Sequence, residues 1–307
     1  DLVHWHFDGV PLVPDTAWDC HGVYTGSTVV EDDRLAVIYT GNVKVDGQHD
    51  FIHTGREANV IRIDRHPDGT WSPKRLLLSW QDYPSFCTRH VRDPKVWRQG
   101  HEWFMVTGAR RQDDQGMVLL WRSDDGEQWH FKSVITSEKA FGYMWECPDL
   151  FRLDGHWFLS FSPQGVPREQ DRRQNIYLSG YIPMKGGEDP CTAELDGDFV
   201  DWDYGFDFYA PQTFETRDGR RILFGWAGMA DADAEYTVPT AAEGWQHMLT
   251  VPREVTLHEG RLRQNPVKEL DAMRLQQLPC KAGETAVVPD TVFDLEIGGM
   301  KGSFELR

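Results

Sequence analysis

A unit of about 60 residues that recurs along the chain is the feature that most restricts its fold. Four segments open in the same way, with a strand-like run that contains polar residues; they begin at Gly22, His90, Met144 and Asp207. Each run is followed by a turn and a strongly apolar second strand, at residues 32–41, 98–110, 152–165 and 216–228. Asp-Gly and Gln-Gly turns favour tight hairpins, and the alternation of apolar and polar residues predicts sheets with one buried face.

Tryptophan residues follow the acidic turns at the ends of these units. Trp5, Trp71, Trp129 and Trp202 lie roughly 60 to 70 residues apart. A period of that length, with three or four strands in each unit, is typical of a β-propeller, whose blades stack around a central channel. The sequence therefore predicts an all-β propeller, with a β-sandwich and a β-helix as the alternatives.

The repeat ends near residue 270, and the tail after it has a different character. The segment AVVPDTVFDLEIGGMKGSFELR at the end of the chain resembles the first strands of another β unit. We therefore expect a propeller domain at residues 1–270, followed at 271–307 by a linker and the beginning of a second domain.

Charge and cysteine content limit the class of protein. The chain has 49 acidic and 32 basic residues, a net charge of -17, which repels nucleic-acid backbones and anionic membrane surfaces. Its five cysteines form no CxxC pair, so reduced thiols and a cytoplasmic location are expected. No histidine pair has metal-ligand spacing and no glycine-rich phosphate loop is present, so no metal and no cofactor is implied. The oligomeric state stays open.

Two carboxylates stand at similar places in adjacent repeats, Asp93 in RDP and Glu146 in ECP. The innermost strands of a propeller line its channel, so polar residues on successive first strands converge there. Arg92 is expected to hold Asp93 ionised, while the apolar neighbours of Glu146 are expected to keep that group protonated. A pair of carboxyl groups with different pKa values is what glycoside hydrolysis requires.

Four sequence motifs resemble the ordered motifs of glycoside hydrolase family 32: HVRDPKVW from His90, YMWECPDLF from Tyr143, SPQG at 162–165 and DYGFDFYAPQTF from Asp203. The resemblance runs from Asp1 to about Asp271, and RDP with ECP in this order and spacing is its most specific part. It implies a five-bladed β-propeller, with an incomplete first blade in this chain, followed by the start of a β-sandwich. It also implies a retaining hydrolase that releases fructose from sucrose, sucrose 6-phosphate or a related β-fructofuranoside.

By position, the resemblance gives Glu146 the role of general acid/base and Asp93 that of transition-state stabiliser, with Arg92 beside it. It places Cys147, Tyr209 and Trp226 around the fructose. The family's FSGS motif corresponds to YTGS here, so Tyr24 and Thr25 take its first two places with a larger ring and an extra methyl group.

The family's nucleophile is an aspartate in an Asn-Asp-Pro-Asn-Gly stretch, and the 307 residues contain no such stretch. Asp1, Asp8 and Asp15 lie in a different motif. A retaining glycosidase forms a covalent intermediate on that second carboxyl group. We therefore expect these residues alone to be inactive, and we expect the motif upstream of Asp1, since the chain does not begin with methionine.

Each assignment has a simpler alternative. Glu146 can be a structural carboxylate, Arg92 and Asp93 a salt bridge, Trp226 a core residue and Cys147 a small buried hydrophobe. For the whole chain, the alternatives are a carbohydrate-binding propeller that has lost its nucleophile and a five-bladed glycosidase acting on arabinose- or xylose-containing chains. A sugar phosphate would need basic residues from loops, for which the candidates are Arg110, Arg111, Arg168, Arg172 and Arg173.

Overall fold

The computed structural model describes residues 1–231, 238–281, 283–289 and 292–296. The chain forms two compact units, one at His6–Val267 and one made of Asp1–Trp5 with Lys268–Arg307. In the described part of the second unit the only regular element is a 3₁₀ helix at Lys268–Met273. No helix in the described residues is long and apolar enough to cross a membrane.

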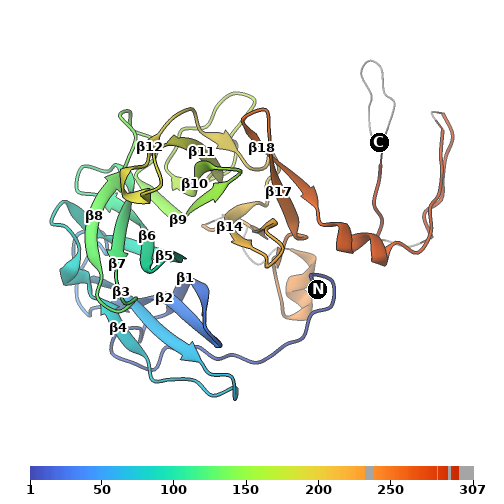
Figure 1. Cartoon of the computed structure of the whole chain (residues 1–307). Coiled ribbons are helices and arrows are strands. Elements are labelled where there is room, and N and C mark those ends of the chain that lie inside the picture. Colours follow the sequence, from blue (N-terminus) through green and yellow to red (C-terminus); the bar gives the residue numbers. More distant parts are fainter. Residues whose placement is uncertain (232–237, 282, 290–291, 297–307) are drawn as a thin grey trace. The chain divides into compact units, whose positions relative to one another are not determined.

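The larger unit is a β-propeller whose sheets radiate from a common centre (Figure 1). The first blade consists of β1 (Val23–Glu31), β2 (Arg34–Lys44), β3 (Arg56–Arg65) and β4 (Arg75–Leu78). The second blade consists of β5 (Cys87–Gln99), β6 (Glu102–Arg111), β7 (Gly116–Ser123) and β8 (His130–Ile135). All pairings within these blades are antiparallel.

The third and fourth blades each have five strands, because short strands extend them. The third has β9 (Met144–Leu153), β10 (His156–Gln164), β11 (Gly180–Lys185), β12 (Glu194–Leu195) and β13 (Val200–Asp201). The fourth has β14 (Tyr209–Glu215), β15 (Arg221–Ala227), β16 (Met248–Leu249), β17 (Arg253–His258) and β18 (Arg261–Pro266). Short 3₁₀ helices lie at Trp80–Asp82, Pro190–Thr192 and Pro239–Glu243.

The predicted propeller and its repeats are confirmed, because each of the four segments supplies the two inner strands of one blade. The prediction of five blades is wrong for the described chain, which has four. Residues 1–14, which resemble the end of an incomplete first blade of the family, contain no strand. The predicted start of a β-sandwich is not confirmed either: no strand occurs in the described residues after Pro266, and 290–291 and 297–307 lie outside them.

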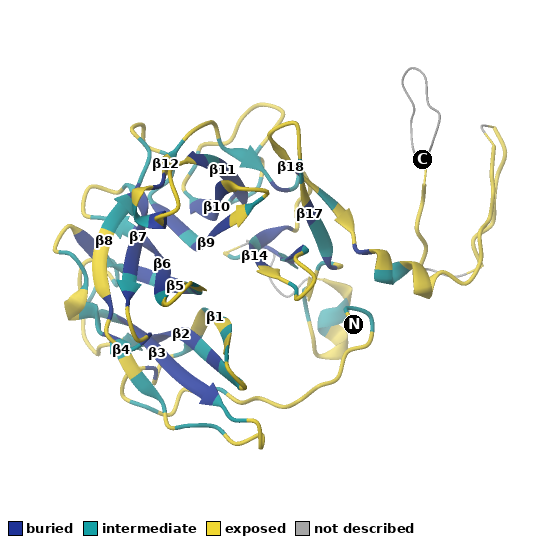
Figure 2. Cartoon of the chain, in the orientation of Figure 1, coloured by how far each residue is buried: buried dark blue, intermediate teal, exposed yellow. Residues whose placement is uncertain are grey.

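The hydrophobic interior lies between neighbouring blades, and its most buried strands are the middle ones, β2, β3, β6, β7 and β10 (Figure 2). On β6, Trp103 and Met105 pack toward the first blade, whereas Phe104 and Val106 pack toward the third. Successive side chains of a strand point to opposite faces, so both faces of this sheet are buried. The expectation of one buried face is therefore wrong for the second blade, and this is why β6 is apolar almost throughout.

The innermost strand of each blade, β1, β5, β9 or β14, has a bulge at the same place. The register of pairing shifts at Tyr24–Gly26 in β1 and at the corresponding points of the other three strands. In β5, β9 and β14 a residue at the bulge has a left-handed backbone and precedes a proline; these residues are Asp93, Cys147 and Ala210, with φ of 64°, 47° and 48°. Proline fits there because a bulge interrupts the ladder that needs its missing N–H. The bulge thus fixes how the strand presents its side chains.

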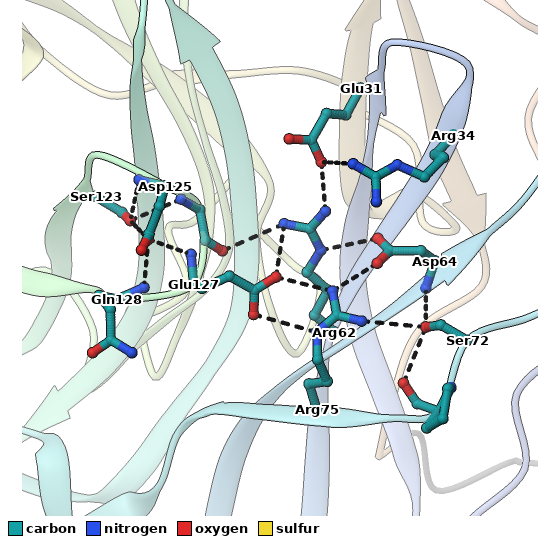
Figure 3. A network of polar contacts seen from close by, with 12 residues as sticks. Glu31, Arg34, Arg62, Asp64, Ser72, Arg75, Ser123, Asp125, Glu127 and Gln128 are labelled. Carbon is teal, nitrogen blue, oxygen red and sulfur yellow. Dashed lines mark hydrogen bonds and ion pairs between the residues drawn. The ribbon is translucent and has the colours of Figure 1, made fainter.

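A buried charge network joins the first two blades (Figure 3). The guanidinium of Arg62 on β3 lies 2.6 Å from Glu31 Oε2, 2.9 Å from Asp64 Oδ1 and 3.4 Å from Glu127 Oε1. Arg75 bridges Asp64 Oδ2 at 2.6 Å and Glu127 Oε1 at 2.9 Å. Glu127 belongs to the turn between β7 and β8, so the network ties the turn of one blade to two strands of another.

Candidate functional site

The carboxylate of Glu146 is the point at which three blades meet. Its Oε1 accepts hydrogen bonds from Nε and Nη2 of Arg92, at 3.0 and 2.6 Å, across from β5. Its Oε2 accepts one from Gln164 Nε2 at 2.9 Å, at the end of β10, and one from the hydroxyl of Tyr209 on β14. The side chain remains 16% exposed, so a ligand can reach a carboxylate that four donor groups hold in place.

This environment differs from the one predicted. The apolar neighbours of Glu146 in the sequence do not enclose its carboxylate: Trp145 stacks on Phe161 with ring centroids 4.1 Å apart and donates its indole N–H to Phe141 O. Adjacent side chains on a strand point to opposite faces, so Trp145 faces the core while Glu146 faces the centre. The apolar enclosure of the Glu146 carboxylate that the sequence predicts is therefore absent, because its immediate partners are polar donors.

Asp93 is the second carboxylate and is only 4% exposed. Its Oδ2 accepts a hydrogen bond of 2.9 Å from the backbone N–H of Cys147, which the bulge in β9 turns toward it. Its own backbone N–H donates to Thr40 Oγ1 at 2.8 Å. The conformation of Asp93 is thus fixed from both neighbouring blades.

Arg92 acts on Asp93 in the direction that the sequence predicts, since its charge lowers the pKa of that carboxyl group, but burial outweighs it. The closest approach between Arg92 Nε and Asp93 Oδ2 is 4.0 Å, because the guanidinium is turned toward Glu146. Burial raises the pKa of Asp93 to about 6; Arg92 opposes this rise and the negative charge of Glu146 adds to it. The carboxyl group with the raised pKa is therefore Asp93.

His90 fixes the position of Arg92. Its Nδ1 accepts a hydrogen bond from Arg92 Nη1 at 2.9 Å, and its Nε2 lies 3.0 Å from the carbonyl oxygen of Phe51. A carbonyl can only accept, so the proton of the neutral ring is on Nε2. Burial, with the charges of Arg92 and Arg56, lowers the pKa of His90 to about 3. No motif in the sequence marks His90 as a metal ligand or a catalytic group, so sequence reasoning did not select it as a site residue.

The other predicted site residues lie around these groups. The side chains of Thr25 and Cys147 are within hydrogen-bonding reach of each other, and Tyr24 lies beside Thr25 on β1, 37% exposed. Burial raises the pKa of the Tyr209 phenol, and so does its hydrogen bond to Glu146. Trp226 pairs with Tyr209 across β14 and β15, with ring centroids 6.4 Å apart. Trp226 therefore contacts Tyr209 rather than Glu146. Arg92 and Tyr209 contact Glu146 directly, and Cys147 contacts Asp93 through its backbone N–H.

Two glutamines of the site were not selected as site residues from the sequence. Gln164 belongs to the SPQG motif and contacts Glu146 directly. Gln212 donates to the carbonyl of Cys147 at 3.0 Å and accepts from Lys95 Nζ at 3.3 Å. The words RDPK, ECPD and YAPQ place Lys95, Asp149 and Gln212 at equivalent positions after the three bulges, and this shared spacing was the available signal.

A layer of polar groups supports the site from beneath. Lys95 Nζ lies 3.5 Å from Asp149 Oδ2, and that oxygen accepts hydrogen bonds of 2.7 Å from both N and Oγ1 of Thr213. The three inner strands β5, β9 and β14 are thereby joined through side chains directly below the two carboxylates. In the described part of the chain, no group of three or more His, Cys, Asp or Glu residues is arranged to hold a metal ion.

The raised pKa of Asp93 predicts an unusual dependence of stability on pH. A carboxyl group whose pKa is raised by folding stabilises the protein below its unfolded value of 3.8, and that contribution is lost as the pH rises through about 6. Asp93→Asn should therefore increase the free energy of unfolding at pH 7.5, by something on the order of 3 kcal/mol, with little effect at pH 4. Urea unfolding at the two pH values measures the difference.

Asp19→Asn is the matched control for this experiment. Asp19 is also buried, but hydrogen bonds from Lys74, Thr16 and Tyr39 outweigh its burial and lower its pKa. Its substitution should lower stability at pH 7.5, the opposite sign. A destabilised Asp93→Asn protein at both pH values would contradict the raised pKa.

The chain is similar in sequence to known glycoside hydrolases. The sequence profile of the glycosyl hydrolases family 32 N-terminal domain matches residues 1–266. The sucrose-6-phosphate hydrolase of Bacillus subtilis is 41% identical over 280 residues, which cover 89% of this chain and 56% of that protein.

Two solved structures are similar as well. The sucrose-6-phosphate hydrolase of Lactobacillus gasseri superimposes with a TM-score of 0.79 at 27% identity, over 90% of this chain and 55% of that one. A β-fructofuranosidase of Bombyx mori in complex with sucrose gives a TM-score of 0.70 at 35% identity, over 83% and 52%. The chain thus spans a little over half the length of each of these proteins.

Proposed function

The chain belongs to glycoside hydrolase family 32, and from this premise we propose that it forms the catalytic part of a β-fructofuranosidase. The reaction releases fructose from sucrose, sucrose 6-phosphate or a related β-fructofuranoside. The observation that carries the proposal is the Glu146 carboxylate, which receives donors from three blades beside the buried Asp93. The relatives, two sucrose-6-phosphate hydrolases and a sucrose-bound β-fructofuranosidase, support the same reaction.

In this proposal Glu146 is the general acid and base. It gives a proton to the oxygen that leaves with the second sugar, and it later takes one from water. Arg92, Gln164 and Tyr209 orient its carboxyl group from three directions, so little reorganisation is needed when the substrate is in place.

Asp93 stabilises the transition state. Its carboxylate is fixed by the N–H of Cys147 and can accept hydrogen bonds from fructose hydroxyls while its charge faces the developing oxocarbenium ion. Thr25, Tyr24, Cys147 and the Tyr209–Trp226 pair are then the residues that contact or border the fructose unit.

A retaining mechanism needs a further carboxylate as the nucleophile, about 5 to 5.5 Å from the acid. Asp8 pairs with Arg65 at 3.0 Å and Asp15 pairs with Lys74, while Asp1 is hydrogen-bonded to His4. Neither Asp8 nor Asp15 contacts Glu146 or Asp93 within the described residues. We therefore propose that the polypeptide of residues 1–307 alone binds a fructoside without hydrolysing it.

The alternative function is a carbohydrate-binding propeller without catalysis, and the lack of a third carboxylate among the described contacts of the site favours it. Both proposals use the same residues around Glu146, so binding alone does not separate them. Turnover by the complete gene product does.

The test is an assay of the complete gene product and of residues 1–307 with sucrose and sucrose 6-phosphate. We expect the complete product to release fructose, with the β-anomer appearing first by NMR, and residues 1–307 to bind in a calorimeter without release. Binding without release by the complete product would establish the alternative. Release by residues 1–307 would overturn the assignment of a separate nucleophile, and neither binding nor release would overturn the fructosidase proposal.

A further inference from the structure

Two cations near the site face each other without an acidic partner. Lys44 at the end of β2 and Arg56 at the start of β3 are directly opposite in the antiparallel register. Like charges at such a position are destabilising unless something neutralises them. In the part of the chain that the structure describes, no carboxylate lies within 4.0 Å of either side-chain cation, although the whole chain carries a net charge of -17.

Hydrogen bonds connect this pair to the catalytic carboxylate. The carbonyl oxygen of Phe51 accepts from Arg56 Nε at 3.1 Å and from His90 Nε2 at 3.0 Å, and the Phe51 ring lies 5.4 Å from Lys44 Nζ. His90 accepts in turn from Arg92, whose guanidinium binds Glu146. Arg56 is therefore connected to Glu146 through Phe51 O, His90 and Arg92. Arg56 also interacts with Tyr24.

We propose that Lys44 and Arg56 form a subsite for a phosphate monoester on the sugar that is joined to fructose. This inference rests on the proposed function and names its substrate class, a phosphorylated β-fructofuranoside. Arg56 uses two of its N–H groups on Phe51 O and Asn42 Oδ1, so its guanidinium is oriented before a ligand arrives. A planar guanidinium with a neighbouring ammonium group matches the two negative charges and the geometry of a phosphate.

The electrostatics around Arg56 are short of negative charge. Arg56 is half-buried, and its burial, together with the charge of Arg92, lowers its pKa from the ordinary value. A bound dianion reverses both effects, because it supplies the missing counter-charge where water is partly excluded. The free protein thus keeps a partly desolvated cation that only a ligand neutralises.

The basic residues that the sequence suggested for phosphate are less suitable. Arg110 pairs with Asp114 at 2.7 Å, and Arg111 pairs with Asp113. Arg172 and Arg173 both pair with Asp201, at 2.8 and 3.4 Å. Arg168 is exposed, with no ion pair within the described residues. Arg56 differs from all of these because it is both partly buried and without a carboxylate partner.

The test compares kcat/KM for sucrose 6-phosphate with kcat/KM for sucrose within each variant, so that any general loss of activity cancels. In the complete gene product we expect Arg56→Gln to lower this ratio by at least about tenfold, and Lys44→Gln to lower it by less. Arg110→Gln removes a neighbouring charge that is already paired, and it should keep the wild-type ratio. An unchanged ratio in both Arg56→Gln and Lys44→Gln would overturn the subsite.

A second measurement separates this proposal from the proposed function. Calorimetric titration of sucrose 6-phosphate and of sucrose should show a preference for the phosphorylated sugar that Arg56→Gln removes. Hydrolysis of both sugars with equal efficiency overturns the subsite and leaves the fructosidase intact. Hydrolysis of neither, with Arg56-dependent binding of sucrose 6-phosphate, overturns the fructosidase and keeps the subsite. Inorganic phosphate is the probe for the other source of the anion: if it binds through Arg56 while sucrose 6-phosphate has no advantage over sucrose, the assignment to a sugar phosphate is wrong.

Discussion

Glu146→Gln should reduce kcat for sucrose hydrolysis by the complete gene product about 10³-fold, with a much smaller change in KM. Glutamine has nearly the same shape, and its amide oxygen can still accept the hydrogen bonds from Arg92. Its NH2 group can donate to the Tyr209 hydroxyl and, once the Gln164 amide turns over, to the Gln164 oxygen, so the site keeps its geometry. The amide cannot transfer a proton, however, and the leaving oxygen then departs without one. Initial rates of fructose release at saturating substrate measure the effect.

The leaving group provides the control for this prediction. An aryl β-fructofuranoside with an acidic phenol needs no proton on departure, so formation of the glycosyl intermediate from it should be nearly unaffected in Glu146→Gln. Glu188→Gln, which changes a surface carboxylate paired with Arg152, should retain wild-type rates on sucrose. If kcat in Glu146→Gln fell less than tenfold, Glu146 would be a structural carboxylate.

Arg62→Met should lower the free energy of unfolding by about 3 to 5 kcal/mol, the largest stability effect that we expect of one substitution. The side chain of Arg62 is 3% exposed and that of Asp64 is 2% exposed, so removal of the guanidinium leaves buried negative charge with only Arg75 to compensate it. Methionine fills a similar volume, which limits the contribution of a cavity. Urea unfolding at pH 7 measures the loss.

The effect should depend on pH with a defined sign. Burial raises the pKa of Asp64, but hydrogen bonds from Arg75 and Arg62 outweigh it and the pKa is lowered overall. The stabilisation is therefore present above pH 3.8 and is lost as the pH falls below it, so the cost of Arg62→Met should shrink in acid. Arg34→Met is the control, because Arg34 is 38% exposed and lies 3.6 Å from Glu31; it should change stability by less than about 1 kcal/mol. A loss below that value for Arg62→Met would show that the network contributes little.

The propeller and the convergence of its carboxylates could be predicted because both follow from local pattern. A strand-like run that contains polar residues, repeated four times, identifies the innermost strand of each blade, and these strands must meet at the centre. Asp93 and Glu146 were identified in this way, whereas Tyr209 and Thr25 were named only by the family resemblance. The four repeated segments correspond to the four blades described, whereas the fifth blade was implied only by the family resemblance, and the residues before Val23 contain no strand.

The partner of each charged group was the part that sequence could not supply. Arg92 and Asp93 are adjacent in the chain, which suggested that they pair with each other. The bulge between Arg92 and Lys95 leaves 4.0 Å between their charged groups, whereas Arg92 binds Glu146 at 2.6 Å. His90 and Gln164 were missed for a similar reason, because only the folded structure shows their partners. His90 joins the site through Arg92 and the Phe51 carbonyl, and Gln164 through Glu146 on the neighbouring strand. The cross-strand pairing of Lys44 with Arg56 likewise depends on the register of β2 and β3 around the loop between them.

The bulges of the inner strands also bear on how such a protein can diversify. In β5 and β9 the pairing with the next strand is regular after the bulge, while the functional side chains lie at or before it. A substitution on the front part of such a strand changes what the site presents, and the extra residue absorbs the backbone adjustment without altering the register behind it. New specificities can therefore evolve on this scaffold by single replacements near the centre, with the packing between blades inherited unchanged.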